Sequence, residues 1–243
     1  MKKSLRIMTF NAMHCGLHEH YLKTGEHVID AKRYAEDIAK VAPDVVGLNE
    51  IRGNDVNDFY GEQTELLCKY SGMKHSFFAP AIQFNDGPYG NAMLSNLEPI
   101  SFENIKIPDP EIKKYDGYYE TRGLIKAKFE GGITVLTTHF GLNPDEVENA
   151  IKTVLENIED EKCIFMGDLN LVESDARLDA IRERMTDTAQ VFGKGMLTFP
   201  SHAPEIKLDY IFVSKDIRVK NVFIPTDVVS DHLPFVAEIE VEI

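Results

Sequence analysis

The stretch that offers the most chemistry is Cys163 to Asn170, whose sequence is CIFMGDLN. Its apolar half is typical of a buried strand, and the strand stops on Gly-Asp-Leu-Asn, so that Asp168 and Asn170 stand close together at a sheet end. A carboxylate and an amide in that arrangement suit the activation of a water molecule beside a hard metal ion and an anionic substrate. The stretch therefore predicts a hydrolytic site at the edge of a sheet.

Other strand-like runs in the chain also stop on, or start after, polar residues. These segments are Leu5–Asn11, Val45–Glu50, Ile133–His139 and the Ser230-Asp231-His232 turn before the alternating strand Phe235–Ile243. When strands repeatedly end in polar residues, those residues can gather along one rim of a sheet. We therefore expect Asn11, Glu50, His139 and Asp231 to lie near Asp168.

The length and composition fit one well-packed domain. A chain of 243 residues with 43% hydrophobic residues can bury a substantial core, and it could form one α/β domain or two small ones. The chain contains no low-complexity tract, repeat or linker rich in Gly, Ser or Pro. We therefore expect one domain over residues 1–243.

The cysteines and the N-terminal segment predict a cytoplasmic location. Cys15, Cys68 and Cys163 are odd in number and far apart, which argues against a disulfide framework. The N-terminal residues run directly into a short strand without the apolar stretch of a signal peptide. The sequence also contains no apolar segment long enough to cross a membrane.

The charge of the chain limits the class of substrate. Forty acidic and twenty-six basic residues give a formal net charge of -14, and no block of Lys or Arg offsets it. Proteins that hold long duplex DNA normally present a basic surface, because neutralised phosphates supply most of the affinity that does not depend on sequence. The charge favours a small phosphorylated substrate, or one approached at a single phosphate, with metal ions supplying positive charge.

Periodicity predicts four helices and more than twice as many strands. The clearest helix is Pro144 to Glu159, which has a continuous apolar stripe, Asn143 as its N-cap and Pro144 in its first turn. The other expected helices are Asp30–Val41, Glu62–Tyr70 and Asp175–Arg184. Further expected strands are Met73–Phe78, Asn91–Ser95, Glu98–Lys106, Tyr119–Phe129, Ile206–Val213 and Val219–Ile224. So many strands indicate two sheets packed face to face with helices outside, rather than a doubly wound sheet.

The motifs together resemble the endonuclease/exonuclease/phosphatase family, and they occur in that family's order. They are Asn11, PDVVGLNEI, YGNAMLSNLEPI, ETRGLIKAKF, TTHFGL, FMGDLN, LDYIFVS and SDHLPF. The resemblance covers almost the whole chain. It implies an α/β fold of the four-layer αββα type, with two mixed β-sheets packed face to face, and hydrolysis of a phosphoester with a divalent metal. Mg²⁺ is the expected ion and Mn²⁺ the alternative.

The resemblance assigns roles around the metal and the water. Glu50 is the expected principal metal ligand, and Asn11 and Asp231 match residues near the same ion. Asp168 and Asn170 would position or deprotonate the attacking water. His232, oriented by Asp209, would donate to the phosphoryl oxygens as a cation, because a neighbouring carboxylate raises the pKa of an imidazole. His139 would be a second donor or acid near the leaving group.

Two further residues are expected to bind the substrate phosphate. Arg122 resembles a family arginine with this role, and its planar guanidinium suits the task. Pairing with Glu120 at the surface is the alternative. Asn91 would present its amide to the cleft, with a purely structural turn as the alternative. The chain departs from many relatives at Asn49, where they have Gln.

Two loops are expected near the cleft. The segment His14 to Gly25 contains three histidines but no spacing that completes a tetrahedral zinc set, so we interpret it as a loop that faces the substrate or the solvent. Gly193 to Gly195, with Met196, Leu197 and Phe199, would shape the cleft mouth.

The function predicted from the sequence is hydrolysis of a phosphoester, by a phosphodiesterase or a phosphatase. The partner is a phosphorylated small molecule or a nucleic acid, with no membrane span and no obligate protein partner. A DNA or RNA nuclease and a catalytically silent module that binds phosphorylated ligands are the alternatives.

Overall fold

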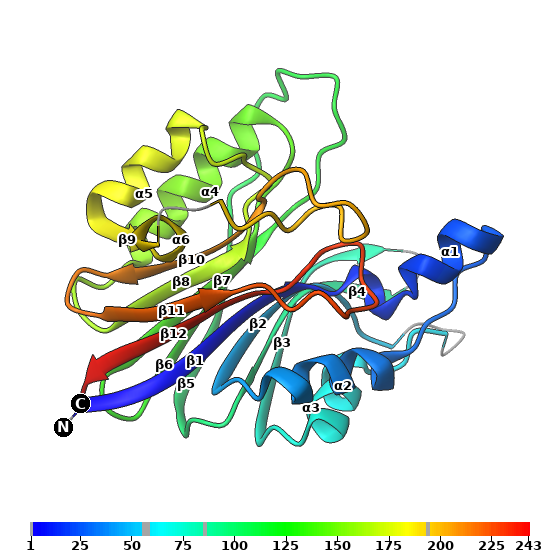
Figure 1. Cartoon of the computed structure of the whole chain (residues 1–243). Coiled ribbons are helices and arrows are strands. Elements are labelled where there is room, and N and C mark those ends of the chain that lie inside the picture. The colour runs from blue at the N-terminus through cyan, green and yellow to red at the C-terminus, as the bar shows by residue number, and fades with distance from the viewer. Residues whose placement is uncertain (1, 55–58, 85–86, 193–194) are drawn as a thin grey trace.

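The chain folds into two six-stranded sheets that pack face to face, with helices on both outer faces (Figure 1). The computed structural model describes residues 2–54, 59–84, 87–192 and 195–243. This arrangement confirms the four-layer αββα sandwich that the strand-rich pattern and the family resemblance predict. Both sheets are mixed, because each contains one parallel pair among antiparallel neighbours.

The first sheet has the strand order β11-β12-β1-β2-β4-β3. Its strands are β1 (Lys2–Asn11), β2 (Val45–Arg52), β3 (His75–Phe84), β4 (Gly87–Ser95), β11 (Arg218–Phe223) and β12 (Phe235–Glu242). The two terminal strands are neighbours, since Lys2 pairs with Glu242, and the chain ends therefore lie side by side (Figure 1).

The second sheet has the strand order β5-β6-β7-β8-β10-β9. Its strands are β5 (Pro99–Lys106), β6 (Gly123–Phe129), β7 (Ile133–His139), β8 (Cys163–Asp168), β9 (Met185–Asp187) and β10 (Asp209–Ser214). The parallel pair, β7 and β8, lies at its centre, as β1 and β2 do in the first sheet.

The helices cover the outer faces of the two sheets. The structure contains α1 (His18–Thr24), α2 (Ala31–Val41), α3 (Gln63–Ser71), α4 (Pro144–Asn157), α5 (Asp179–Arg184), α6 (Thr188–Val191) and the 3₁₀ turns η1 (Met13–Cys15) and η2 (Ala176–Leu178). Helices α2 and α3 pack on the first sheet, and α4 and α5 pack on the second (Figure 1). Among the described residues, no helix has the length and apolar character needed to cross a bilayer.

Strand alternation divides the core into three layers. On β1, Leu5 and Ile7 face the layer between the sheets, whereas Met8 and Phe10 face the outer layer under α2 and α3. Side chains alternate between the two faces of a strand, so a run of apolar residues can serve two layers. The third layer lies between the second sheet and α4 and α5.

The predicted elements match the structure except at some boundaries and in one loop. The segment from His14 to Gly25, predicted as a loop, contains part of η1 and the whole of α1. Helix α1 buries none of its residues, so it has no apolar stripe by which its sequence could be recognised. The short elements β9 and α6 were also not predicted. Residues 193 and 194 of the predicted cleft-mouth loop lie outside the described residues.

Candidate active site

The central strands of both sheets deliver polar residues to one edge of the sandwich. In the parallel pair of the first sheet Asn11 pairs with Asn49, and in that of the second His139 pairs with Asp168. Asp209, at the start of antiparallel β10, also pairs with Asp168. The register therefore explains why residues far apart in the sequence meet here.

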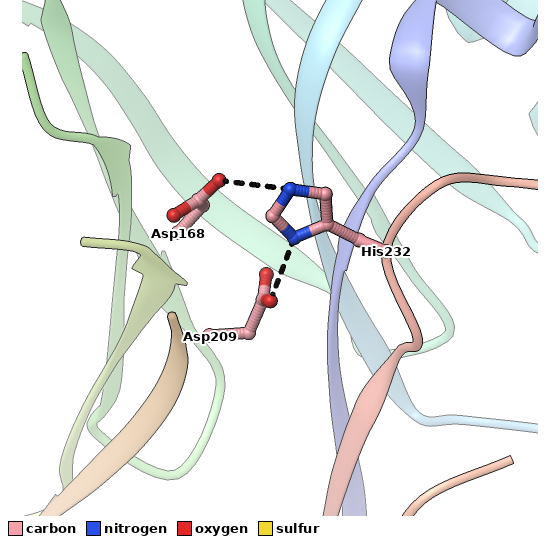
Figure 2. Close-up of side chains that lie close together, drawn as sticks. All are labelled: Asp168, Asp209 and His232. Carbon is pink, nitrogen blue, oxygen red and sulfur yellow. Dashed lines mark hydrogen bonds and ion pairs between the residues drawn. The ribbon is translucent and has the colours of Figure 1, made fainter. Parts of the chain in front are cut away.

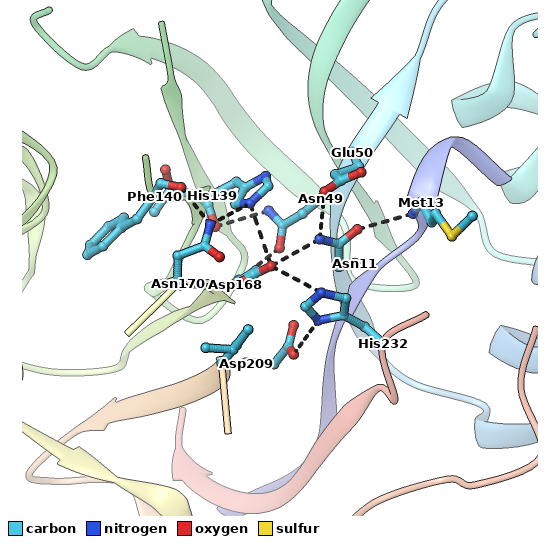
Figure 3. A network of polar contacts seen from close by, with 12 residues as sticks. Asn11, Met13, Asn49, Glu50, His139, Phe140, Asp168, Asn170, Asp209 and His232 are labelled. Atoms are coloured by element: carbon cyan, nitrogen blue, oxygen red, sulfur yellow. Dashed lines mark hydrogen bonds and ion pairs between the residues drawn. The ribbon is translucent and has the colours of Figure 1, made fainter. Parts of the chain in front are cut away.

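Asn11 joins the two sheets at this edge (Figure 3). Its Nδ2 donates to Oε1 of Glu50 and to Oδ2 of Asp168, both at 3.0 Å. Its Oδ1 accepts from the backbone N–H of Met13 at 3.1 Å. An amide that bridges two carboxylates in this way fixes their separation, so Asn11 sets the distance between the candidate metal ligand and the candidate base.

Asn49 makes a second bridge between the sheets, and its importance was not predicted. Its Oδ1 accepts from the backbone N–H of Asp168 at 2.9 Å, and its Nδ2 donates to the carbonyl of Thr138 at 3.0 Å. The same Nδ2 donates to Oδ1 of Asn91. The side chain is fully buried. A buried amide with all these bonds holds β8 at a fixed position relative to β2.

Gly167 lets β7 and β8 approach each other beside the site. Its φ is +149°, and a Cβ at this position would lie 1.9 Å from the carbonyl oxygen of Thr138. The obstacle is backbone, which cannot rotate away as a side chain can. Glycine is therefore required immediately before Asp168, which explains the Gly-Asp order of the motif.

Glu50 and Asn170 occupy left-handed backbone conformations that are uncommon for residues other than glycine. Their φ values are +59° and +50°. The pairing of β2 with β4 is irregular between Leu48 and Ile51, and this bulge contains Glu50. Bulges redirect side chains and are frequent next to functional sites. Both residues are thus turned out of the ordinary strand pattern where they join the polar cluster.

His232 and Asp209 form a hydrogen-bonded pair opposite Asp168 (Figure 2). Nδ1 of His232 lies 2.9 Å from Oδ2 of Asp209, and Nε2 lies 3.7 Å from Oδ2 of Asp168. Burial by itself would lower the pKa of His232, but Asp209 and Asp168 outweigh burial and raise that pKa to about 10. His232 is therefore a cation at neutral pH, and its Nε2–H points at Asp168.

The turn that carries His232 is fixed to the first sheet. Oγ of Ser230 donates to the carbonyl of Asn11 at 2.8 Å and accepts from the N–H of His232 at 3.3 Å. The ring of Phe199 covers the imidazole, with the ring centroids 4.8 Å apart. Of the loop predicted at the cleft mouth, Phe199 therefore contacts the site directly.

Asp168 is the centre of the cluster. Burial and the charge of Asp209 raise its pKa to about 7, against the opposing effects of His232 and Asn11. Oδ2 of Asp168 faces Nε2 of His139 at 3.5 Å and Nε2 of His232 at 3.7 Å. Both distances exceed a normal hydrogen bond, so the two imidazoles face Asp168 as close polar neighbours without a direct bond.

His139 is a neutral histidine in this structure. Burial, followed by the positive charge of Arg122, lowers its pKa well below the ordinary value. Its Nδ1 lies 3.0 Å from Nη1 of Arg122, which can only donate. Its Nε2 lies 3.0 Å from Nδ2 of Asn170. His139 therefore fits a hydrogen-bonding role better than that of a cationic acid.

Arg122 pairs with Glu120, the alternative that the sequence left open, and its contact with a substrate phosphate stays a prediction. It contacts His139 inside the site, and its Nη1 also lies 2.6 Å from Oε1 of Glu120. Burial and the charge of Glu50 raise the pKa of Glu120, whereas Arg122 lowers it. Nε of Arg122 is buried and has no hydrogen-bond partner in the part of the chain that the structure describes.

The capping box of α4 holds the segment that carries Arg122. Glu146 accepts from the backbone N–H of Asn143 at 3.1 Å, and its other oxygen accepts from the N–H of Glu120 at 2.9 Å. Asn143 donates to the carbonyl of Tyr118 at 2.9 Å. The residues that start the helix therefore also fix the loop that ends at Arg122.

The surroundings of Glu50 fit a divalent cation. Oε1 of Glu50 accepts from Asn11, and Oε2 lies 3.6 Å from Nε2 of His14. Burial, followed by the negative charge of Glu50, raises the pKa of Asp231. Two carboxylates that repel each other in a half-buried site are a donor set that a hard cation stabilises. Oδ1 of Asn11 keeps one lone pair, because Met13 uses only the other.

A second group of potential ligands lies at Asp168, Asp209 and His232, whose ligand atoms are within 4.8 Å of one another. His232 is hydrogen-bonded to Asp209 and forms an ion pair with Asp168. The ring of His232 is occupied on both sides, because Nδ1 contacts Asp209 and Nε2 faces Asp168. We therefore assign the candidate cation site to Glu50 and its neighbours.

The structure brings together nearly all of the site residues predicted from the sequence. Direct contacts link Asn11, Glu50, Arg122, His139, Asp168, Asn170, Asp209 and His232, and Asp231 is coupled to Glu50 by charge. Asn91 differs, since its amide bonds to Asn49 and to the carbonyl of Gly123 in the interior. This geometry favours the structural alternative for Asn91 and gives no support to a phosphate contact.

The fold and the site define a class of protein: a four-layer sandwich with carboxylates, amides and histidines at the strand ends of both sheets. The model of the Endonuclease/Exonuclease/phosphatase family matches residues 8–232. The chain belongs to this family. No curated protein matches the chain by sequence.

Solved structures share the fold at low sequence identity. A family member from Bacteroides vulgatus has a TM-score of 0.76 and 19% identity, covering 99% of this chain and 100% of its own. The mannosyl-6-phosphatase Bt3783 of Bacteroides thetaiotaomicron has a TM-score of 0.73 and 16% identity, covering 97% and 99%. D. rerio TDP2 complexed with a single-strand DNA product has a TM-score of 0.65 and 17% identity, covering 98% and 99%.

Proposed function

We propose that the chain hydrolyses phosphoric esters with the help of a divalent metal ion, by in-line attack of water on phosphorus. The observation that carries this proposal is the bridge made by Asn11, which binds Glu50 and Asp168 at 3.0 Å each while His232 faces Asp168. Family membership supports hydrolysis of a phosphoester. The neighbours named as a phosphatase and as a complex with a DNA product support it as well.

The attacking water would lie beside Asp168 and Asn170. Asp168 is an ionisable carboxylate whose pKa burial raises to about 7, so it can both orient a water molecule and accept its proton. Asn170 is held by the bond from its Nδ2 to the carbonyl of Phe140 at 3.0 Å. The water oxygen forms the new bond to phosphorus while the ester P–O bond breaks.

The cationic groups would bind the phosphoryl oxygens. His232 carries a positive charge and directs Nε2–H into the site, and Asp209 fixes its tautomer. Arg122 would add a second positive charge beside His139, whose Nδ1 lies 3.0 Å from its Nη1. Groups held in place before the reaction lower the barrier because they do not reorganise as charge develops.

The ion, Mg²⁺ or Mn²⁺, would be held by Glu50 and Asp231 with the free lone pair of Asn11 Oδ1. When bound, it supplies positive charge to the phosphoryl and leaving oxygens. His14, which lies against Glu50 and was placed by the sequence only in a loop, would complete the surroundings of the ion.

The test is a comparison of esters with matched variants. Purified protein is incubated with bis-p-nitrophenyl phosphate, p-nitrophenyl phosphate and single-stranded DNA in Mg²⁺ or Mn²⁺, with and without chelator. We expect hydrolysis that the chelator abolishes, that Asp168→Ala reduces about a hundredfold or more, and that exposed Asp160→Ala leaves unchanged. Equal activity in Asp168→Ala and wild type would contradict the proposal.

The same panel separates the substrate classes. Preference for the diester indicates a phosphodiesterase, preference for the monoester a phosphatase, and release of nucleotides from DNA a nuclease. Binding of phosphorylated ligands without turnover would indicate the catalytically silent module. The net charge of -14 favours a substrate reached at one phosphate over long duplex DNA. The single domain and the cytoplasmic location remain predictions from the sequence.

A further inference from the structure

A buried lysine, Lys207, lies two residues before Asp209 in the chain, and the proposed mechanism does not use it. The side chain of Lys207 is only 1% exposed, and its Nζ lies 3.7 Å from Oδ1 of the equally buried Asp187. Its Nζ also lies 3.1 Å from the centre of the Tyr210 ring. Burying an ammonium group is unfavourable unless charges or π-systems compensate, so a lysine here needs an explanation.

Two polar atoms at this place lack partners. Within the described part of the chain, neither Nζ of Lys207 nor Oδ1 of Asp209 has a hydrogen bond, although both are buried. Lys207 lies two residues before Asp209, which begins β10. Burial lowers the pKa of Lys207, and the negative charges of Asp187, Glu173 and Asp209 raise it.

The two carboxyl oxygens of Asp209 thus have different surroundings. Oδ2 accepts from His232, whereas Oδ1 has no donor and stands in the field of the Lys207 ammonium. A buried carboxylate keeps its charge only when positive charge or hydrogen bonds offset its desolvation. His232 donates to Oδ2, and Lys207 is the cation two residues before Asp209 in the chain.

Resting on the proposed function, we propose that Lys207 is a positioning residue for the Asp209–His232 pair. Its ammonium group, anchored by Asp187, attracts the unpartnered Oδ1 of Asp209 and so keeps Oδ2 turned toward Nδ1 of His232. His232 then directs Nε2–H at the phosphoryl oxygens. Lys207 touches neither substrate nor metal in this proposal, and it acts only through Asp209.

A purely structural role would be to join β9 to β10 through the ion pair of Lys207 with Asp187. The two roles differ in their dependence on Asp209. If Lys207 acts through Asp209, removing the charge of Lys207 should have no effect in a variant in which residue 209 is uncharged. If Lys207 only stabilises the sheet edge, the effect is the same with or without the Asp209 charge.

The experiment is a double-mutant cycle on the full chain. Lys207→Met conserves volume and removes the charge, Lys207→Gln retains a donor for Asp187, and Lys207→Arg retains the charge. In the wild-type background we expect Lys207→Met and Lys207→Gln to lower kcat about tenfold with little change in KM. Lys207→Arg should retain most of the wild-type kcat. In the Asp209→Asn background, the same substitutions should change kcat by less than about twofold. Equal losses in both backgrounds would overturn the proposal.

A second measurement does not depend on turnover. The Nδ1 proton of His232, held against Asp209, should give a downfield proton NMR signal in the wild type and in Lys207→Arg. We expect this signal to shift or broaden in Lys207→Gln, while far-UV circular dichroism shows an intact fold. An unchanged signal in Lys207→Gln would refute the role of Lys207. Lack of turnover in the wild type would instead refute the proposed hydrolase activity, and the NMR signal would still test Lys207.

Discussion

The 2.9 Å contact between Nδ1 of His232 and Oδ2 of Asp209 connects the two sheets of the sandwich. His232 lies in the turn before β12 of the first sheet, whereas Asp209 begins β10 of the second. Together with the bridges made by Asn11 and Asn49, this contact makes the polar site part of the connection between the sheets. The geometry of the site therefore depends on the packing of the whole sandwich.

Removing the imidazole of His232 should lower turnover without unfolding the protein. His232→Ala deletes the cation that faces Asp168, and we expect kcat to fall about a hundredfold, as when single stabilising donors are removed from other enzymes. The measurement is the steady-state rate with the preferred ester. His27→Ala, at an exposed position, is the control and should keep full activity. Comparable rates for both variants would exclude His232 from catalysis.

Neutralising Glu50 should weaken the response to metal before it affects the fold. Glu50→Gln keeps the size of the side chain and removes the charge that a hard cation needs. We expect the Mg²⁺ concentration for half-maximal activity to rise about tenfold or more. Glu65→Gln, at an exposed position of α3, is the matched control. A Mg²⁺ titration unchanged in Glu50→Gln would place the ion elsewhere, first of all at Asp168, Asp209 and His232.

Adding one methyl group at Gly167 should disturb both fold and site. The Cβ of Gly167→Ala would meet the carbonyl oxygen of Thr138, so β7 and β8 must move apart next to Asp168. We expect a loss of several kcal/mol in the free energy of unfolding, beyond the usual effect of a point mutation. In Gly25→Ala the φ is also positive, at +75°, but no atom lies within 4 Å of the added Cβ. Chemical denaturation of both variants separates the clash from backbone strain, which should cost about 1–2 kcal/mol.

The sequence predicts the strand ends of the site because the signal is local. Asp168, His139 and Glu50 each follow an apolar run, and a run that stops on a polar residue can be read without knowing its neighbours. The same locality explains what was missed. Asn49 looks like an ordinary strand residue, and only the packing of the two sheets shows that it bonds to the backbone of Asp168.

His14 and Lys207 were missed for different reasons. His14 lies in a turn with φ of +53°, and it reaches Glu50 only because three consecutive residues adopt left-handed backbone conformations. Lys207 is buried against the general tendency of lysine to stay at the surface. Neither feature follows from hydrophobic periodicity or from the ordered motifs of the sequence.

The capping box of α4 should affect activity through Arg122. Glu146→Ala removes the acceptor for the N–H groups of Asn143 and Glu120, so the helix start and the arginine loop should both loosen. We expect about 1 kcal/mol of lost stability and a raised KM, because Arg122 is less well placed for the phosphate. Exposed Glu156→Ala in the same helix should change neither quantity. A normal KM in Glu146→Ala would show that the loop holds Arg122 without the helix.

The pH dependence of Lys207 should separate activity from stability. Burial lowers the pKa of Lys207 from 10.5 to about 8, although Asp187, Glu173 and Asp209 raise it; Arg182 lowers it further. Because the folded pKa lies below the unfolded one, the unfolded chain binds more protons between about pH 8 and 10.5, and stability gains as pH rises through that window. The ammonium charge of Lys207 is lost over the same range. We therefore expect wild-type kcat to fall above about pH 8 while the wild type becomes more stable relative to Lys207→Met, by on the order of 3 kcal/mol once the lysine is fully neutral.

Lys207→Arg, which stays charged, should keep its kcat to higher pH. Rates and denaturation midpoints at pH 7, 8 and 9 measure both effects, and identical pH profiles for wild type and Lys207→Arg would show that the charge on residue 207 does not reach the site.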